Sequence, residues 1–526
     1  MKSPEELFPF PSFREYQREA LSDALSALRS GKNIVLDLPT GIGKSGINIA
    51  LSREFSSSYY TTPQRELRLQ LKEDDVLSKY YHVLEARRDY LCKTTGVNCD
   101  ECSFYTDPQK SCSDDDITCT YMNELGRACF SKTTVLTMSR LLIAGQKRYK
   151  SKLDKRDLLI VDEAQNLEDQ TASMHANIRI GPDELPNSVF EPVVDKIDPP
   201  KKPNEDAELP VLTHKDIWSK IIDIQSRLNG YIEHYKNTPE KTDEIIQCKM
   251  MLKNLEYFFK ENNIDRTWVV GIYEIDGVNG IELKPVKVDM FLKSHFWSKG
   301  DQIVLSTATV PYRGKEDIWL QQLGLDPDSF EIISYPTPFD PLNRMVHTRY
   351  EVGKMSQNQD ELWEDAMVTL NHLASENQNL NGLVHTASYK RAQKIIDSSS
   401  EYNYLDGNII IDESGKSKVD DWQKSDKDIF VSPSLMEGVN LDGDKCRWQA
   451  LFKVPYPHPA DPRVRKMLHD DRWYWYNQKA AVKILQSVGR AVRSKDDSAD
   501  FYVIDGSFED VRNSVKLPEW FNESIC

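Results

Sequence analysis

The stretch "NIVLDLPTGIGKSGINIA" (33–50) joins a short apolar run to a glycine-rich turn. Residues 33–38 predict a buried strand, and the residues from Ser45 onward predict a helix. Between them, Gly41 and Gly43 let backbone N–H groups approach a polyphosphate, and the helix N-terminus adds positive potential at the same place. A strand, such a loop and a helix, in this order, are the context that a phosphate loop needs. The stretch therefore predicts a nucleotide-binding α/β domain.

The two residues that end this loop suggest the chemistry of the site. Lys44 would reach the β- and γ-phosphates of a nucleotide, and Ser45 would bind Mg²⁺. The strict eight-residue form of the motif begins with glycine, and Leu38 stands at that position here. The segment "PTGIGKS" (39–45) fits a looser form, Thr-Gly-x-Gly-Lys-Ser. We therefore expect a nucleotide with Mg²⁺ at this loop.

A second element of the expected nucleotide site is the acidic end of a strand in "DLLIVDEAQN" (157–166). Residues 158–161 predict a buried strand, and Asp162 and Glu163 fall at its carboxyl end, where parallel α/β sheets bind ligands. We expect Asp162 to hold Mg²⁺ through water and Glu163 to orient or deprotonate the attacking water.

Two further strands end in small hydroxyl residues. The strand in "SYYTTPQRELRLQL" (58–71) ends at Thr61-Thr62-Pro63, and "QIVLSTATV" (302–310) is a similar case. We expect the first to offer hydroxyl and backbone donors to a nucleic-acid phosphate. The second could relay hydrogen bonds between a nucleotide and a bound strand. Either stretch alone is also compatible with an ordinary packed strand end.

Residues 380–510 predict a second parallel α/β unit. Apolar strands at 382–386, 409–411, 428–432, 449–454 and 501–504 alternate with helix-like stretches. Within it, "QSVGRAVRS" (486–494) is expected inside, or at the end of, a helix that begins near Lys479. Arg490 and Arg493 would then share a helix face and point at a γ-phosphate held by the first unit.

The order of these motifs resembles superfamily 2 helicases, and specifically the XPD/DinG family of iron–sulfur DNA helicases, over nearly the whole chain. "FREYQ" (13–17) resembles the family's N-terminal nucleotide motif, which makes Gln17 the expected adenine reader. "PTGIGKS", "DEAQN", "LSTAT", "GLVHTASY", "MEGVNL" and "QSVGRAVR" resemble motifs I, II, III, IV, V and VI. Gln165 replaces the usual histidine and Asn440 the usual aspartate, which puts the coupling of hydrolysis to strand movement in question.

The resemblance implies ATP, Mg²⁺ and a [4Fe–4S] cluster as cofactors. The residues expected to act in catalysis are Lys44, Asp162, Glu163, Gln486, Arg490 and Arg493. Those expected to bind the nucleotide are Gln17, Thr40, Gly41, Ile42, Gly43, Lys44, Ser45, Glu437 and Gly438. Ser45 and Asp162 are the expected Mg²⁺ ligands.

Six of the nine cysteines lie between Cys92 and Cys129. On the residues alone, four cysteines with one C-x-x-C pair also suit tetrahedral Zn²⁺. The resemblance implies an iron–sulfur cluster instead, since the family carries one in this interval. The expected ligands are Cys92, Cys99, Cys102 and Cys119, with Cys112 as the alternate for Cys99. We expect Cys129 to be a small core residue.

The resemblance implies an α/β protein with two RecA-like helicase lobes, into the first of which an iron–sulfur domain and a mainly helical arch domain are inserted. We expect the first lobe at 1–88, 130–185 and 291–327, the cluster domain at 89–129, the arch at 186–290 and the second lobe at 328–526. Two amphipathic helices, 213–235 and 242–262, are expected in the arch. A β-hairpin at 268–286 is expected to turn at Asn279-Gly280.

Composition bounds the remaining possibilities. The N-terminus lacks the apolar core of a secretory signal, and no apolar run reaches about 18 residues, so we expect an intracellular, soluble, cytoplasmic protein without membrane contact. The net charge of −16 argues against a passive nucleic-acid coat but leaves room for a basic groove.

The leading hypothesis is an ATP-dependent DNA helicase or translocase. By resemblance it moves 5′ to 3′ on single-stranded, forked or tailed DNA in repair or processing, as a monomer with possible repair-complex partners. A structural repair subunit with weak ATPase activity is one alternative. A translocase that strips proteins or R-loops is the other.

Overall fold

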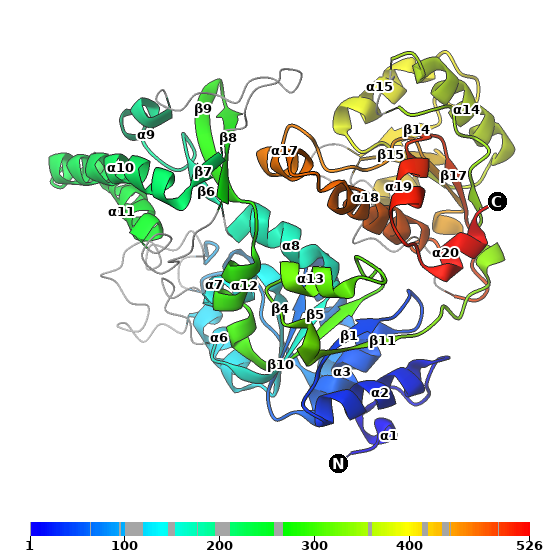
Figure 1. Cartoon of the computed structure of the whole chain (residues 1–526), viewed down its shortest axis with the longest axis horizontal. Coiled ribbons are helices and arrows are strands. Elements are labelled where there is room, and N and C mark those ends of the chain that lie inside the picture. Colours follow the sequence, from blue (N-terminus) through cyan, green and yellow to red (C-terminus); the bar gives the residue numbers. More distant parts are fainter. Residues whose placement is uncertain are drawn as a thin grey trace.

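Two parallel β-sheets form two lobes, and a small antiparallel sheet with its own helices projects from the first (Figure 1). The computed structural model describes residues 2–63, 65–93, 96–99, 119–145, 153–175, 177–194, 211–256, 267–355, 360–412, 419–433, 441, 443–492 and 494–526. Within these residues, no helix combines the length and the apolar character needed to cross a membrane.

The first lobe is built on a parallel sheet with the strand order β11-β1-β10-β5-β2-β4-β3. Its strands are β1 (Asn33–Asp37), β2 (Ser58–Thr62), β3 (His82–Val83), β4 (Thr133–Thr137), β5 (Arg156–Asp162), β10 (Gly300–Thr307) and β11 (Phe330–Ser334). We expected the second lobe to begin at residue 328, but β11 pairs with β1 and belongs to the first sheet.

Helices cover both faces of this sheet, so its strands are apolar on both sides. Along β5, Leu158 and Ile160 pack into one core with α2 (Gln17–Arg29) and α3 (Lys44–Glu54). Leu159 and Val161 point the other way, into a core shared with α6 (Thr120–Phe130), α7 (Met138–Gly145), α12 (Asp289–His295) and α13 (Glu316–Gln322). This two-sided burial explains the continuous apolar runs of the sequence. Short α1 (Pro4–Leu7), α4 (Arg65–Glu73) and α8 (Leu167–Gln170) are the other α-helices of the lobe among the described residues.

The inserted unit is a mixture of helices and sheet. It contains β6 (Ile178–Ile180), β7 (Val211–Thr213), β8 (Thr267–Ile275), β9 (Val278–Pro285), α9 (Asn187–Val194), α10 (His214–Tyr235) and α11 (Thr242–Glu256). Its sheet has the order β6-β9-β8-β7 and is antiparallel. Because β6 joins this sheet, the insert begins before residue 186, where we expected it to start.

The hairpin of the insert turns at Asp276-Gly277, and our expectation of Asn279-Gly280 was wrong. Ile275 pairs with Val278, and Asp276 and Gly277 have φ angles of 52° and 80°. Positive φ at both central residues is the signature of a type I′ turn. Gly280 lies inside β9 opposite Tyr273, where a Cβ would approach the ring Cζ to 2.5 Å. The glycine at this position makes room for an aromatic ring.

The second lobe has a parallel sheet in the order β12-β17-β16-β13-β15-β14. Its strands are β12 (Val346–His347), β13 (Gly382–His385), β14 (Ile409–Ile411), β15 (Ile429–Ser432), β16 (Trp448–Leu451) and β17 (Asp500–Val503). Its helices are α14 (Trp363–Glu376), α15 (Tyr389–Ser399), α16 (Val419–Lys424), α17 (Pro462–His469), α18 (Trp473–Val488), α19 (Phe508–Ser514) and α20 (Glu519–Ser524). The five strands expected from the sequence are confirmed to within a few residues.

Candidate active site between the lobes

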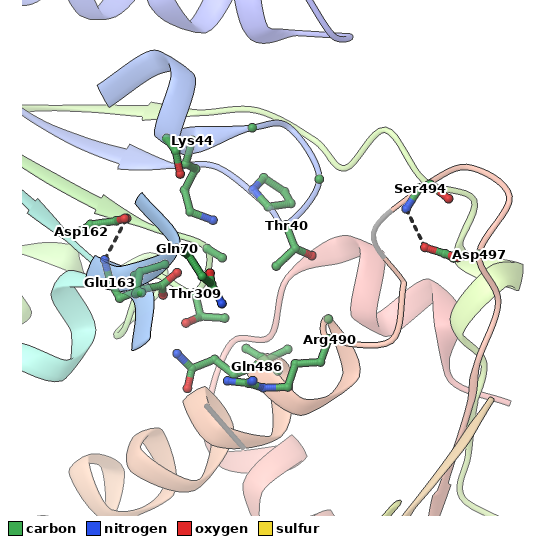
Figure 2. Close-up of a pocket in the computed structure, with 18 of the residues that line it drawn as sticks. Thr40, Lys44, Gln70, Asp162, Glu163, Thr309, Gln486, Arg490, Ser494 and Asp497 are labelled. Atoms are coloured by element: carbon green, nitrogen blue, oxygen red, sulfur yellow. Dashed lines mark hydrogen bonds between the residues drawn. The ribbon is translucent and has the colours of Figure 1, made fainter. Parts of the chain in front are cut away.

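A cleft of about 710 Å³ lies where the carboxyl ends of β1, β5 and β10 face the end of α18. Its walls bring together nine residues that the sequence singled out: Thr40, Gly41, Gly43, Lys44, Ser45, Asp162, Glu163, Gln486 and Arg490. Figure 2 shows Lys44, Asp162 and Glu163 on one wall, with Gln486 and Arg490 on the opposite one. Seven of these residues come from the first lobe and two from the second, so the cleft is complete only when both lobes are present.

The phosphate loop has a backbone that only glycine adopts without strain. Gly41 and Gly43 have φ angles of 92° and 89°, and a Cβ on Gly41 would lie 2.0 Å from the ring Cζ of Phe339. The ring of Phe339 therefore packs closely on the loop, and α3 begins at Lys44 directly after it. The Lys44 ammonium donates to the carbonyl of Leu38 at 3.3 Å. It has further protons to offer to a phosphate.

Gln17 braces the loop. Its amide nitrogen donates to the carbonyl of Gly43 at 3.1 Å, and its amide oxygen accepts from the backbone N–H of Arg14 at 2.9 Å. The side chain is only 3% exposed and does not line the cleft. Ile42 is also buried, in the core behind the loop. In this structure neither side chain faces the cleft.

Asp162 is a buried carboxylate at the end of β5. One of its oxygens accepts from the hydroxyl of Tyr60 at 2.8 Å, and the other from the backbone N–H of Glu163 at 3.1 Å. Burial raises the pKa of Asp162 to about 6, and the charge of Glu163 adds to the rise while Lys44 opposes it. Burial disfavours the negative charge of Asp162, so a cation beside it would be favourable. With the Ser45 hydroxyl on the same wall, the site suits Mg²⁺, which prefers oxygen ligands.

Glu163 and Gln165 form a relay to the neighbouring strand. The Gln165 amide nitrogen donates to a Glu163 carboxylate oxygen at 2.7 Å, and its amide oxygen accepts from the Thr307 hydroxyl at 2.6 Å. The Thr307 hydroxyl oxygen in turn accepts from the backbone N–H of Thr309, which lines the cleft. Gln165 therefore connects the acidic strand end with the end of β10.

The second lobe contributes Gln486 from α18 and Arg490 from the turn that follows it. We expected Arg490 and Arg493 to share a helix face, but α18 ends at Val488, so Arg490 lies beyond the helix. At this turn a Cβ on Gly489 would lie 3.2 Å from the Thr40 hydroxyl of the phosphate loop, which shows how closely the lobes approach. Arg493, Glu437, Gly438 and Asn440 lie outside the described residues.

The structure adds residues that the motifs did not reveal. Arg14, Gln70, Asn166, Ser494, Asp497 and Trp520 also line the cleft. Asp497 orders its own loop by accepting from the backbone N–H groups of Ser494 and Gly443, at 3.0 and 3.2 Å. Trp520 lies far beyond the last motif, and nothing in the local sequence connects it with the site.

The end of β2 does not present a threonine hydroxyl as we expected. Thr61 and Thr62 are fully buried, and the Thr61 hydroxyl donates to the carbonyl of Ile160 on β5 at 3.0 Å. This hydroxyl stabilises the sheet. Pro63, the next residue, lines the cleft.

The cysteines that the structure describes do not complete a metal site. Cys92 and Cys99 lie on a small loop, where the Cys92 N–H donates to Val97 and the Cys99 N–H to Tyr90. Cys119 precedes α6, and Cys129, near the end of α6, packs partly buried against the core. Among the described residues, no group of three or more His, Cys, Asp and Glu side chains could hold a metal ion. Cys102 and Cys112 lie outside them.

Comparisons with known proteins agree with this arrangement. A family model described as "Helicase C-terminal domain" matches residues 370–524, and one described as "Type III restriction enzyme, res subunit" matches residues 10–181. The chain is 25% identical over 257 residues to "ATP-dependent DNA helicase DinG" of Photobacterium profundum, a match covering 45% of this chain and 36% of the relative. It is 20% identical over 255 residues to "Probable ATP-dependent helicase YpvA" of Bacillus subtilis, covering 45% and 38%. The matched part thus spans little more than a third of these relatives.

Solved structures share the architecture along the whole chain. One titled "XPD_Helicase" has a TM-score of 0.67 at 15% identity and covers 98% of both chains. "Structure of S. tokodaii Xpd4" has a TM-score of 0.61 at 14% identity and covers 97% of this chain and 99% of its own. These likenesses establish the fold. Together with the sequence matches to the two lobes, they make the chain similar to the XPD/DinG-like family of superfamily 2 helicases.

Proposed function

We propose that the chain is an ATP-dependent DNA helicase or translocase that hydrolyses ATP in the cleft between its lobes. The observation that carries the proposal is the meeting of Lys44, Asp162 and Glu163 of one lobe with Gln486 and Arg490 of the other around one cavity. Phosphoryl transfer needs a cation at the γ-phosphate, a metal ligand, a residue that orients water and a second cation for the developing charge. The cleft supplies each of these groups.

The roles follow from the positions of the side chains. Lys44 and the N-terminus of α3 bind the phosphates, and Ser45 and Asp162 would hold Mg²⁺, whose charge would offset that of the phosphate oxygens. Glu163, oriented by Gln165, accepts the proton of the attacking water. Arg490 stabilises the charge that develops on the transferred phosphoryl group, and Arg493 is the second arginine proposed for this role. Because Arg490 belongs to the second lobe, hydrolysis requires the lobes to be closed.

The proposed substrate is single-stranded DNA next to a fork or a tailed duplex, with movement from 5′ to 3′. The relatives' printed names, among them "ATP-dependent DNA helicase DinG", support DNA as the substrate, and the family resemblance supports the polarity. Comparing the unwinding of a 5′-tailed and a 3′-tailed duplex tests the direction. A protein that hydrolyses ATP with DNA but separates neither duplex would instead favour the stripping of proteins or R-loops.

Lys44→Ala tests the hydrolysis itself. We expect DNA-stimulated ATP hydrolysis to fall by at least about a hundredfold, because a cation in a preorganised site is worth about 3 kcal/mol or more to the transition state. Lys32→Ala is the matched control, since Lys32 precedes β1 and donates to the carbonyl of Asp328. Near-normal turnover by Lys44→Ala would contradict the ATPase assignment. A wild type with little hydrolysis at saturating DNA would favour the structural-subunit alternative.

We also propose a [4Fe–4S] cluster bound by Cys92, Cys99, Cys102 and Cys119, on the sequence resemblance. Iron and labile sulfide, measured on anaerobically purified variants, test this ligand set. Cys92→Ser, Cys99→Ser and Cys119→Ser should lose iron, whereas Cys129→Ser should keep it. If Cys99→Ser kept its iron and Cys112→Ser lost it, Cys112 would be assigned as the ligand in place of Cys99. If the purified wild type contained zinc and no iron, the site would be assigned as a zinc site.

A further inference from the structure

Trp520 of α20 forms part of the wall that the second lobe contributes to the cleft. It is half-buried and lines the same cavity as the phosphate loop. It is also the only aromatic side chain among the described lining residues. Its helix packs on the segment Pro341–Arg344 of the connection between the lobes, and the hydroxyl of Ser524 donates to the carbonyl of Pro341. An aromatic ring is thus held at the junction of the two lobes.

The guanidinium of Arg344 lies over the Trp520 ring. Its guanidinium carbon lies 3.9 Å from the centroid of the Trp520 ring, and the side chain is only 1% exposed. Its only hydrogen bond to a described residue runs from Nη2 to the Thr337 hydroxyl, and Nε and Nη1 have no partner there. Burial lowers the pKa of Arg344 to about 10. Among the described residues no carboxylate pairs with this buried guanidinium, which is costly, and contact with the electron-rich indole face offsets part of that cost.

The residues expected to bind the phosphates lie at one end of the cleft. Lys44 and Asp162 mark the phosphate end, whereas Ser494 and Asp497 lie well away from them on the far side of Thr40 (Figure 2). Trp520 and Arg14 line the same cavity without belonging to the phosphate loop. The amide of Gln17, the residue expected to recognise adenine, forms hydrogen bonds with the backbone of Arg14 and Gly43. Because Gln17 is 3% exposed and does not line the cleft, a flat apolar ring that does line it is the better candidate for contact with the nucleobase.

We propose that Trp520 is the base-stacking residue of the nucleotide site, and that Arg344 positions its ring. The inference rests on the proposed function, because it names how that same site recognises its substrate. Stacking on an aromatic ring tolerates any base, but a purine covers more of an indole than a pyrimidine does. Because Trp520 belongs to the second lobe and the phosphate loop to the first, the base and the phosphates of one nucleotide would draw the lobes together.

The test separates the base from the phosphates. Dissociation constants for ATP, UTP and inorganic tripolyphosphate are measured by calorimetry in a Glu163→Gln background, which prevents turnover. Trp520→Ala should weaken ATP binding roughly ten- to a hundredfold, since one base stacked on an aromatic ring is worth about that factor. It should leave tripolyphosphate binding unchanged and reduce the preference for ATP over UTP. Trp520→Phe, which keeps a ring, should recover most of the affinity for ATP.

Arg344→Met tests the positioning role. It keeps the length of the side chain and removes the charge, so we expect a smaller loss of ATP affinity with no loss for tripolyphosphate. Arg447→Met, on a partly exposed arginine of the same lobe paired with Asp444, is the control and should change neither constant.

Two results would overturn the inference. They are unchanged ATP binding in Trp520→Ala, and an equal loss for ATP and tripolyphosphate, which would make Trp520 a support of the wall only. Both are distinct from a failure of the proposed function, which would show as a parent protein that neither binds nor hydrolyses ATP.

Discussion

Glu163 has a left-handed backbone, with a φ angle of 50°, directly after the buried end of β5. A non-glycine residue in this region carries strain, and such residues gather at functional sites. The conformation turns the chain so that Gln165 comes back to the Glu163 carboxylate. An amide donates through nitrogen and accepts through oxygen at once, so glutamine satisfies Glu163 and Thr307 together. The unusual residue of this motif is thus compatible with a complete relay.

Gln165→Leu should lower the turnover number for DNA-stimulated ATP hydrolysis about tenfold and leave KM nearly unchanged. The substitution leaves the Thr307 hydroxyl without its acceptor and Glu163 without its orienting donor, and each buried bond lost costs about 1–3 kcal/mol. Gln321→Leu, at an exposed position of α13, is the matched control. Steady-state kinetics at saturating DNA measure both variants. A rise in KM alone would place Gln165 in nucleotide binding instead.

At the scale of elements, the strands were predictable and the ends of elements were not. Strands buried on both faces leave a continuous apolar run in the sequence, and β1, β5 and β10 show this. α18 ends next to Gly489, which approaches Thr40 across the cleft. No periodicity records such a contact. The predicted position of the hairpin turn was wrong for a related reason. Gly277 and Gly280 are both compatible with a turn, and the sequence does not record that the ring of Tyr273 packs against Gly280 in the folded sheet.

The candidate site divides in the same way. Asp162 and Glu163 lie at the end of β5, and Lys44 begins α3 after the loop that follows β1, and in both places a run of apolar residues followed by a turn marks the position in the sequence. Trp520 has no such signal, since its place on the wall depends on the packing of α20 against the connection between the lobes. A residue of this kind becomes visible only when both lobes are folded.

At the scale of the whole molecule, a buried ion cluster joins the lobes beside the cleft. Glu168 of α8 accepts from Arg463 of α17 at 2.5 Å and from Lys479 of α18 at 2.8 Å. Lys479 also contacts Asp169, and the Trp475 ring nitrogen donates to Glu168 at 3.3 Å. Lys284 of the insert pairs with Asp461 at the start of α17. The second lobe is thus bound both to the segment that carries Glu163 and to the insert, through residues hundreds of positions apart in sequence.

Glu168→Gln should destabilise the protein at neutral pH, and the loss should shrink in acid. Burial disfavours the negative charge of Glu168 and would raise its pKa, but the positive charges of Lys479 and Arg463 have the larger effect and lower the pKa to about 2. Because this pKa lies below the value of about 4.3 in an unfolded chain, the carboxylate stabilises the fold fully above that value. The contribution is lost as the pH falls through about 2. At pH 7 the variant leaves two buried cations short of a partner, which costs about 3–5 kcal/mol.

The free energy of unfolding from urea titrations, measured between pH 7 and pH 2.5, compares the variant with wild type. The difference in free energy of unfolding should be largest at pH 7 and decline below about pH 4.3. Acid protonates Glu168 in the wild type, and the substitution has already removed that negative charge from the variant. Glu5→Gln, at an exposed pair with Arg18, should change little at any pH. A difference for Glu168→Gln that stays constant over this range would mean that the carboxylate charge is not what joins the lobes.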